Sequence, residues 1–205
     1  MLSVTAISLR IFLVRILFLK DLFSEVVLTD VKLLVGVIVL SLSVTLAKHQ
    51  QYGSVPAETG FNGFVGAVAI IASIVGLFSL FMENIKGTLV MGFDFLVALL
   101  YLAAGIAYAI ALKSVPSCSS NEDYAKAERY ENKILNRGCK GSGMSKYCAY
   151  GDSPGTDDTS SRCQMARADY VFEFIGFIFV MAMVAFGYVL NRRGGSMTST
   201  RATHV

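Results

Sequence analysis

The sequence predicts an all-α, multi-pass membrane protein built as a bundle of four transmembrane helices. Apolar residues make up 54% of the 205 residues and charged residues only 16%, against roughly 25% in ordinary soluble proteins. A soluble chain of this length has too much surface to hide so many apolar side chains in one core. Several apolar runs also approach or exceed the length of about 20 residues that a membrane-spanning helix needs. A bilayer is therefore the expected solvent for most of the chain.

Hydropathy places four candidate spans along the chain. The predicted spans cover residues 32–48, 61–82, 87–112 and 170–190. The second span carries no charge, the third carries only Asp94 and the fourth only Glu173. The first span is shorter, but Lys32 and Lys48 at its ends can extend their ammonium groups toward the lipid headgroups. These four spans define the membrane domain.

Two polar or mixed segments flank this domain. The predicted parts are an N-terminal extension at residues 1–31, the four-helix membrane domain at 32–190 and a polar tail at 191–205. Arg10, Arg15 and Lys20 interrupt the apolar residues of the extension, so it is interpreted as an interfacial helix or a disordered segment. Its basic residues lie inside the apolar run and no cleavage site follows, which argues against a signal peptide.

The basic residues near the ends of the spans predict the orientation. They are more frequent on the side that carries both termini, and basic residues favour the cytosol. We therefore expect both termini in the cytosol, and the long loop at residues 113–169 outside the cell or in the lumen.

All four cysteines lie in this loop, namely Cys118, Cys139, Cys148 and Cys163. An even number of cysteines in an oxidising compartment predicts two disulfides, and the spacing alone leaves three pairings open. The alternative is four free thiols with the opposite topology. A zinc site is disfavoured because the loop has no histidine and no C-x-x-C pair of cysteines. In the same loop, Ser119 and Glu122 form a capping-box pattern that predicts a helix at residues 120–136.

The sequence predicts no enzyme, no cofactor, no metal and no nucleic-acid partner. Its net charge of +3 is scattered, so it offers no basic stripe for nucleic acid. One catalytic pattern, G-x-S-x-G, occurs at residues 151–155, but Pro154 follows the serine. A nucleophile elbow uses the backbone N–H after the serine to bind the oxyanion, and proline has none.

Asp94 is the most informative charged residue, because a carboxyl group in mid-span costs roughly 2.5–3.5 kcal/mol. It should face other helices and find a donor. Ser41, Ser73 and Ser79 lie at comparable depths, and Lys32 can reach toward it. The preferred interpretation is a buried polar contact that fixes helix packing, and the alternative is a proton or ion relay. Glu173 is expected in the first turn of the last span, where it can reach water.

Small residues predict the faces along which the helices pack. Ala103, Ala107 and Ala111 repeat every four positions in the third span, and Gly76 lies in the second. In lipid, small residues let helices approach closely and gain van der Waals contact. Packing within the bundle is the preferred interpretation, and homo-oligomerisation is the alternative.

Two stretches of the chain resemble the four-span MARVEL membrane-domain family, especially its fungal non-classical-export type. One lies in the third span, where residues 93–96 read Phe-Asp-Phe-Leu and residues 102–105 read Leu-Ala-Ala-Gly before Cys118 follows. The other is the end of the long loop, where residues 161–168 read Ser-Arg-Cys-Gln-Met-Ala-Arg-Ala before Tyr170 opens the last span. The resemblance covers roughly residues 32–190. The long loop with its two extra cysteines and the segment 1–31 depart from the family pattern.

This resemblance implies a Cys118–Cys163 bridge, which leaves Cys139 to pair with Cys148. It also implies a non-enzymatic protein of the plasma membrane or secretory pathway, working in membrane subdomains, in some cases sterol-rich, or in trafficking and unconventional secretion. The partners would be the lipid bilayer, further copies of the chain or other membrane proteins. The alternatives are a tetraspanin-like scaffold, although the Cys-Cys-Gly of tetraspanins is absent, and a small ion or proton transport subunit that uses Asp94.

Overall fold

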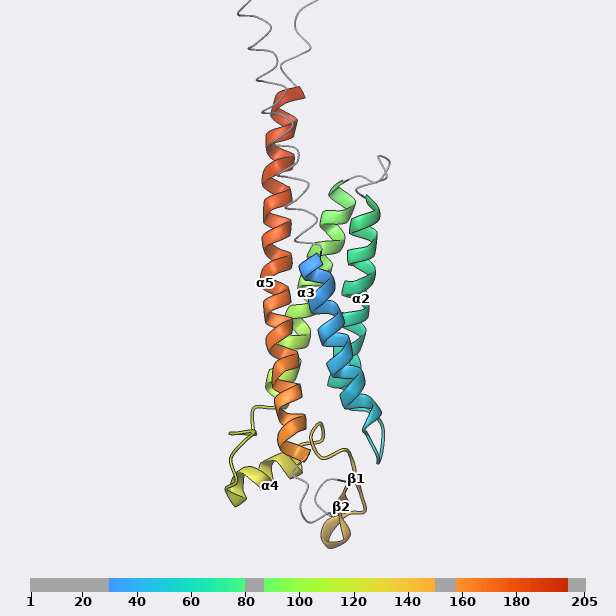
Figure 1. Ribbon diagram of the computed structural model, residues 1–205, viewed down its shortest axis with the longest axis vertical. Coiled ribbons are helices and arrows are strands. Elements are labelled where there is room, and N and C mark those ends of the chain that lie inside the picture. The colour runs from blue at the N-terminus through green and yellow to red at the C-terminus, as the bar shows by residue number, and fades with distance from the viewer. Residues whose placement is uncertain (1–29, 80–86, 150–157, 199–205) are drawn as a thin grey trace, which may run out of the picture.

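Four long helices lie side by side in a narrow bundle, and a small polar cap closes one end of it (Figure 1). The computed structural model describes residues 30–79, 87–149 and 158–198. The four helices are helix 30–48 (Asp30–Lys48), α2 (Ala57–Ser79), α3 (Gly87–Ala111) and α5 (Asp158–Thr198). The predicted extension at 1–31 lies almost wholly outside the described residues.

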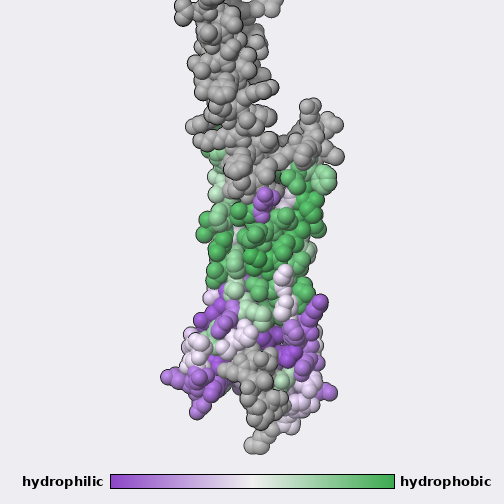
Figure 2. Space-filling model, in the orientation of Figure 1, coloured by the Kyte–Doolittle hydropathy of each residue, from purple (hydrophilic) through white to green (hydrophobic). Residues whose placement is uncertain are grey.

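Each long helix carries a stretch that is long and apolar enough to cross a membrane. These stretches are Asp30–Lys48, Ala57–Ser79, Leu89–Ala111 and Thr159–Val189. A helix satisfies its backbone polar groups internally, which is the condition for crossing hydrocarbon. Figure 2 shows the consequence as a broad apolar band across the face of the bundle in view, with hydrophilic residues gathered at the cap. The predicted four-helix membrane fold is confirmed.

The last helix begins much earlier than the sequence predicted. The prediction placed the start of the span at residue 170, where the apolar run begins, but α5 begins at Asp158. The cap covers the first turns of this helix, and Cys163 and Ala166 are fully buried there in one cluster with Leu46 and Ile134. Hydropathy marks the start of an apolar run, and in this helix the run starts well after the helix does.

Glycine allows helix 30–48 and α2 to come into close backbone contact. A Cβ atom built on Gly66 would lie 2.7 Å from the backbone nitrogen of Leu40 and 3.0 Å from the carbonyl oxygen of Gly36. Only a hydrogen atom fits at that distance. Elsewhere, the ring of Tyr101 packs over Gly176 of α5 in the same way, with 3.1 Å to the position of a Cβ. Residues lacking a side chain therefore set the spacing of the bundle.

The alanine repeat predicted for α3 lies only partly on the face that packs in the bundle, and Ala111 packs at the edge of a buried cluster. Ala103 is exposed, and Ala107 and Ala111 are only half-buried. The buried face of this helix instead contains Val97, Ala98, Tyr101, Ala104, Gly105 and Tyr108. A repeat of four residues advances 40° beyond a full turn at each step, so it leaves the packed face, whereas alternating steps of three and four stay on it.

The cap comprises residues 112–149 and contains three short elements and a turn. These are α4 (Asp123–Glu131), β1 (Cys139–Lys140), the 3-10 turn η1 (Gly143–Ser145) and β2 (Tyr147–Cys148), with β1 antiparallel to β2. The helix predicted at 120–136 is therefore shorter, and its capping box was wrong. Glu122 is the N-cap residue and makes no side-chain cap bond. The C-cap residue of this helix is Asn132, whose side-chain amide donates to the Ala111 carbonyl at 2.7 Å.

Two disulfides stabilise this cap. Cys118 pairs with Cys163, which joins the segment after α3 to the start of α5 across 45 residues of sequence. Cys139 pairs with Cys148, its partner in the β1–β2 register. The pairing implied by the family resemblance is confirmed.

The cap also docks on the loop between helix 30–48 and α2. The carbonyl oxygen of Arg137 accepts bonds from the backbone N–H groups of Gln51, at 2.9 Å, and Tyr52, at 3.2 Å. Next to it, Gly138 has a φ of +90°, and a Cβ built on it would overlap the Tyr52 carbonyl oxygen. The contact therefore requires glycine at position 138 for two reasons: its positive φ and its lack of a side chain.

Replacing Gly66 with alanine is expected to destabilise the bundle by about 1–3 kcal/mol, because the added methyl group forces two helix backbones apart. Unfolding of the purified chain in detergent measures the effect. Gly92→Ala is the matched control, since a Cβ there meets nothing within 4 Å. Equal unfolding temperatures for the two variants would contradict this account of the helix contact.

Replacing Gly138 with alanine is expected to loosen the cap from the loop below it. Gly143→Ala is the control, because Gly143 also has a positive φ, +59°, but a Cβ there meets no neighbour within 4 Å. Both variants carry backbone strain of order 1 kcal/mol, and only Gly138→Ala should speed hydrogen exchange at the amide nitrogen of Tyr52. Equal exchange rates in the two variants would show that the contact contributes nothing.

Candidate functional site

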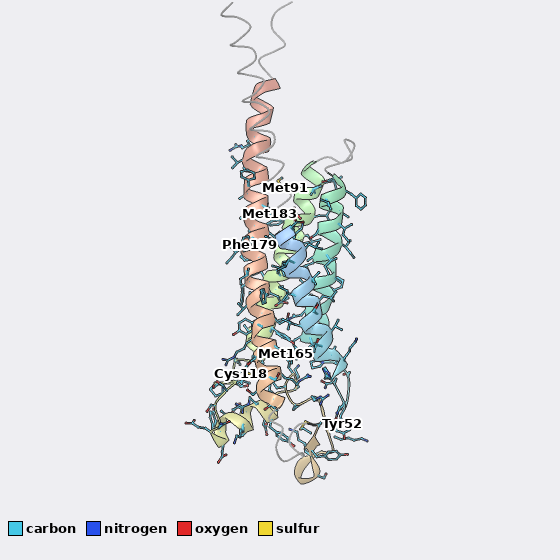
Figure 3. The ribbon with its side chains drawn as sticks, viewed as in Figure 1. Tyr52, Met91, Cys118, Met165, Phe179 and Met183 are labelled. Atoms are coloured by element: carbon cyan, nitrogen blue, oxygen red, sulfur yellow. A yellow bond between two sulfur atoms is a disulfide. The ribbon has the colours of Figure 1, made fainter. Side chains whose placement is uncertain are left out.

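Two layers of buried polar side chains cross the apolar interior of the bundle. The layer farther from the cap contains Lys32 of helix 30–48 and Asp94 of α3, which are 2% and 7% exposed. The Lys32 ammonium donates to Asp94 Oδ1 at 2.5 Å. Figure 3 places Met91, one turn before Asp94, at the end of the bundle away from the cap, and Cys118 at the cap. An ion pair therefore joins two helices within the predicted hydrocarbon region.

The other predicted members of this layer have different roles. Ser41 is exposed and donates to the Val37 carbonyl of its own helix at 2.6 Å, so its prediction as a partner of Asp94 was wrong. Ser73 is buried, but its hydroxyl donates to the Ala69 carbonyl one turn earlier at 2.8 Å. Such bonds satisfy a hydroxyl group without a second helix. Ser79 does the same with the Gly76 carbonyl, at 2.6 Å.

Gly76 makes room for the lysine. A Cβ atom on this residue would lie 3.8 Å from Lys32 Nζ. The predicted small residue thus lies where a long side chain from the neighbouring helix passes. A larger residue here would crowd the ammonium group that neutralises Asp94.

The second layer lies nearer the cap and contains Asp169 and Glu173 of α5, which are both 0% exposed. Asp169 Oδ2 accepts a bond from the Ser43 hydroxyl at 2.9 Å and from the Asn62 amide at 3.4 Å. The sequence assigned Asp169 to the loop and placed Glu173 in a first turn open to water. Both interpretations were wrong, because α5 begins at Asp158 and the acids lie in its interior, facing the other helices.

The sequence did contain a signal for this buried face. The residues at 162, 166, 169, 173, 176 and 180 are all buried and follow alternating steps of four and three. This spacing marks one continuous face of a helix. It was missed because charged residues at these positions look like the end of an apolar run.

Two tyrosines of α3 border the second layer. The Tyr108 hydroxyl is 3.0 Å from Thr59 Oγ1 of α2. The Tyr101 hydroxyl is buried and has no hydrogen-bond partner among the residues that the structure describes. The aromatic rings thus extend polar oxygens into the same part of the bundle as the acids of α5.

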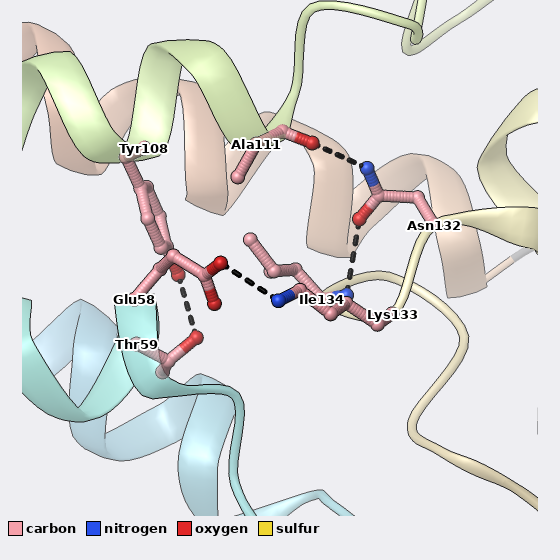
Figure 4. A network of polar contacts seen from close by, with 7 residues as sticks. All are labelled: Glu58, Thr59, Tyr108, Ala111, Asn132, Lys133 and Ile134. Carbon is pink, nitrogen blue, oxygen red and sulfur yellow. Dashed lines mark hydrogen bonds and ion pairs between the residues drawn. The ribbon is translucent and has the colours of Figure 1, made fainter.

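A polar junction connects this layer to the cap (Figure 4). Lys133 of the cap pairs with Glu58 at the start of α2, at 2.7 Å, and Asn132 accepts a bond from the Ile134 N–H at 3.0 Å. Deeper inside, Arg162 Nη2 donates to the carbonyl oxygens of Leu46, at 3.1 Å, and Ile134, at 2.8 Å. A cation at the last carbonyl groups of helix 30–48 also complements the negative end of that helix.

The described residues do not include a cluster of the side chains that bind transition metals. Within residues 30–79, 87–149 and 158–198, no three His, Cys, Asp or Glu side chains gather as a metal site. His49 is exposed, and its ring nitrogen lies 2.8 Å from the Thr45 carbonyl. The G-x-S-x-G pattern at 151–155 lies outside the described residues.

Breaking the Lys32–Asp94 pair from one side is expected to destabilise the fold by about 3–5 kcal/mol, because one buried charge is left alone. Lys32→Met and Asp94→Asn should each show this loss, and the double variant should regain much of it. A double-mutant cycle on thermal unfolding in detergent measures the coupling.

The cycle at Lys133 and Glu58 is the control. The Lys133 side chain is 65% exposed, and exposed ion pairs contribute at most about 1 kcal/mol. Coupling energies of the same size at both pairs would mean that burial does not strengthen the inner pair.

The model of the membrane-associating domain MARVEL matches residues 23–186 of the chain. No curated protein and no solved structure matched the chain. The finer resemblance to the fungal export type stays a prediction. Since the match covers well over half of the 205 residues and the four spans of the bundle lie almost wholly within it, the chain belongs to the MARVEL family of membrane-associating proteins.

Proposed function

We propose that this chain is a non-enzymatic organiser of lateral membrane subdomains, including sterol-rich ones, that acts in trafficking or unconventional secretion. The observation that carries the proposal is the apolar belt, the ring of lipid-facing side chains around the four helices. Members that are more than half exposed include Leu34, Phe64, Ile71, Leu89, Ile110 and Ile178. Soluble proteins rarely expose such a continuous apolar surface. In a bilayer, this belt is the surface through which the chain acts on lipid.

Exposed aromatic rings in the belt support a preference for sterols. Phe93 and Phe95 of α3 are about half exposed, and on α2 the exposed ring of Phe64 stacks on Phe61 with 6.5 Å between centroids. Flat, rigid rings offer a large contact area with few rotatable bonds. A sterol nucleus is equally rigid, so the two surfaces lose little conformational entropy on contact.

The proposed orientation puts the cap outside the cell or in the lumen, with both termini in the cytosol. Its support is the pair of disulfides in the cap, because disulfides persist in oxidising compartments. The plasma membrane and the secretory pathway meet that condition. The same orientation leaves the end of the bundle near Asp94 facing the cytosol.

The Lys32–Asp94 pair argues against transport through Asp94. The Asp94 carboxylate already has the buried ammonium group of Lys32 at 2.5 Å. The lysine neutralises its charge, so the carboxylate does not need a transported ion or proton as its partner. A relay would need the pair to open during each cycle. A fixed contact between two helices agrees better with a scaffold embedded in lipid. Assembly with further copies through the exposed Ala103 face stays a prediction.

The proposal is tested by the distribution of the labelled full-length chain in giant vesicles that separate into sterol-rich and sterol-poor phases. We expect enrichment in the sterol-rich phase, and a weaker enrichment for the double variant Phe93→Leu, Phe95→Leu, which keeps the apolar character but removes two rings. The control is Ile106→Leu with Ile110→Leu, two exposed aliphatic residues on the same helix. Equal concentrations of the wild-type chain in both phases would refute the proposal.

A further inference from the structure

The carboxyl groups of Asp169 and Glu173 are buried with too few partners. Both side chains are 0% exposed. Among the described residues, no hydrogen bond reaches Asp169 Oδ1 or either carboxyl oxygen of Glu173. Burying an uncompensated carboxylate costs several kcal/mol even after the protein relaxes. A folded protein therefore needs something at this place that offsets the cost.

A second, independent observation points to the same place. Asn62 of α2 is 0% exposed, and its amide nitrogen lies 3.4 Å from Asp169 Oδ2. The oxygen of that same amide group has no hydrogen-bond partner among the described residues. This side chain therefore presents an unused acceptor next to the acids, from a different helix.

The groups with unused oxygens come from three helices that pack against one another. Asp169 and Glu173 are four residues apart on α5, so they share one face with Cβ atoms about 5–6 Å apart. The ring of Tyr101 packs on Gly176, one turn beyond Glu173 on that face. The Tyr101 hydroxyl is also unpartnered within the described part of the chain.

The buried basic side chains near this face are engaged elsewhere. Lys32 pairs with Asp94 in the other layer. Arg162, two turns before Asp169, donates through Nη2 to the carbonyl oxygens of Leu46 and Ile134. The Ser43 hydroxyl donates to Asp169 but carries no charge. Neither of these hydrogen-bonded basic groups is therefore bonded to Asp169 or Glu173.

We propose that Asp169, Glu173 and the Asn62 side-chain oxygen, with the Tyr101 hydroxyl, form a binding site for a hard divalent cation, best fitted by Ca²⁺. Two carboxylates balance two positive charges. The ligand set is all oxygen, which hard cations prefer, and Ca²⁺ accepts irregular geometry, whereas Mg²⁺ demands a near-ideal octahedron and keeps several waters. A bound ion would connect α2, α3 and α5 just below the cap. This inference does not depend on the proposed membrane-organising role.

The test is thermal unfolding of the purified full-length chain in detergent, first in chelator and then with CaCl₂, MgCl₂ or NaCl at constant ionic strength. At a hundredfold excess over its Kd, Ca²⁺ should raise the unfolding temperature by about 5–10 °C, and the other salts should raise it less. Unfolding temperatures that are equal in chelator and in every salt would overturn the proposal.

The variant Glu173→Gln keeps the shape of the side chain and removes its charge. It should fold in chelator at least as well as the wild type, and its response to Ca²⁺ should be lost. Glu131→Gln, at an exposed position of α4, is the matched control and should keep the full response. A Ca²⁺ response that survives in Glu173→Gln contradicts the site. Stabilisation of the wild type at low pH, with no response to any metal ion, also contradicts the site. It would mean that protonation of the carboxyl groups offsets the cost of burying them.

Discussion

The absence of water in the hydrocarbon layer is the constraint on which this structure depends. Each polar group between the two membrane surfaces must find its partner inside the protein, because lipid supplies none. Backbone groups meet this demand by forming helices. Hydroxyl groups such as those of Ser41 and Ser73 meet it by bonding to carbonyl oxygens of their own helix. Charged groups need a second helix, which is how Lys32 and Asp94 come to fix the packing of the bundle.

The bundle and the cap are stabilised in different ways. The core of the bundle is narrow, with small residues such as Gly66 and Ala69 letting helix backbones meet, and lipid replaces the outer half of a soluble core. The cap is too small to bury much apolar surface in water. It uses covalent and polar ties instead: two disulfides, and the contact of Arg137 with the loop below. Arg162 connects the bundle to the cap through its bonds to the carbonyl oxygens of Leu46 and Ile134.

The sequence predicted the features that long-range composition controls. Four apolar runs defined four helices, and the cysteines in one loop defined two bridges. It did not predict the start of α5, because hydropathy locates apolar runs and does not see a polar helix covered by a cap. For the same reason, Asp169 and Glu173 were placed near water. The face of α3 that packs was missed because small size was taken as the signal, whereas large residues such as Tyr101 and Tyr108 occupy it.

The two polar layers differ in their balance of charge, so the two ends of the bundle are not equivalent. The layer at Lys32 and Asp94 contains equal and opposite charges and is complete in itself. In the layer at Asp169 and Glu173, the two acids are paired only with uncharged groups among the described residues, and several of their oxygens have no partner there. A self-neutral layer holds helices in place whatever the medium contains, whereas a layer of acids is stable only with a positive partner. Of the two layers, the one beneath the cap is therefore the one whose stability depends on the surrounding solution.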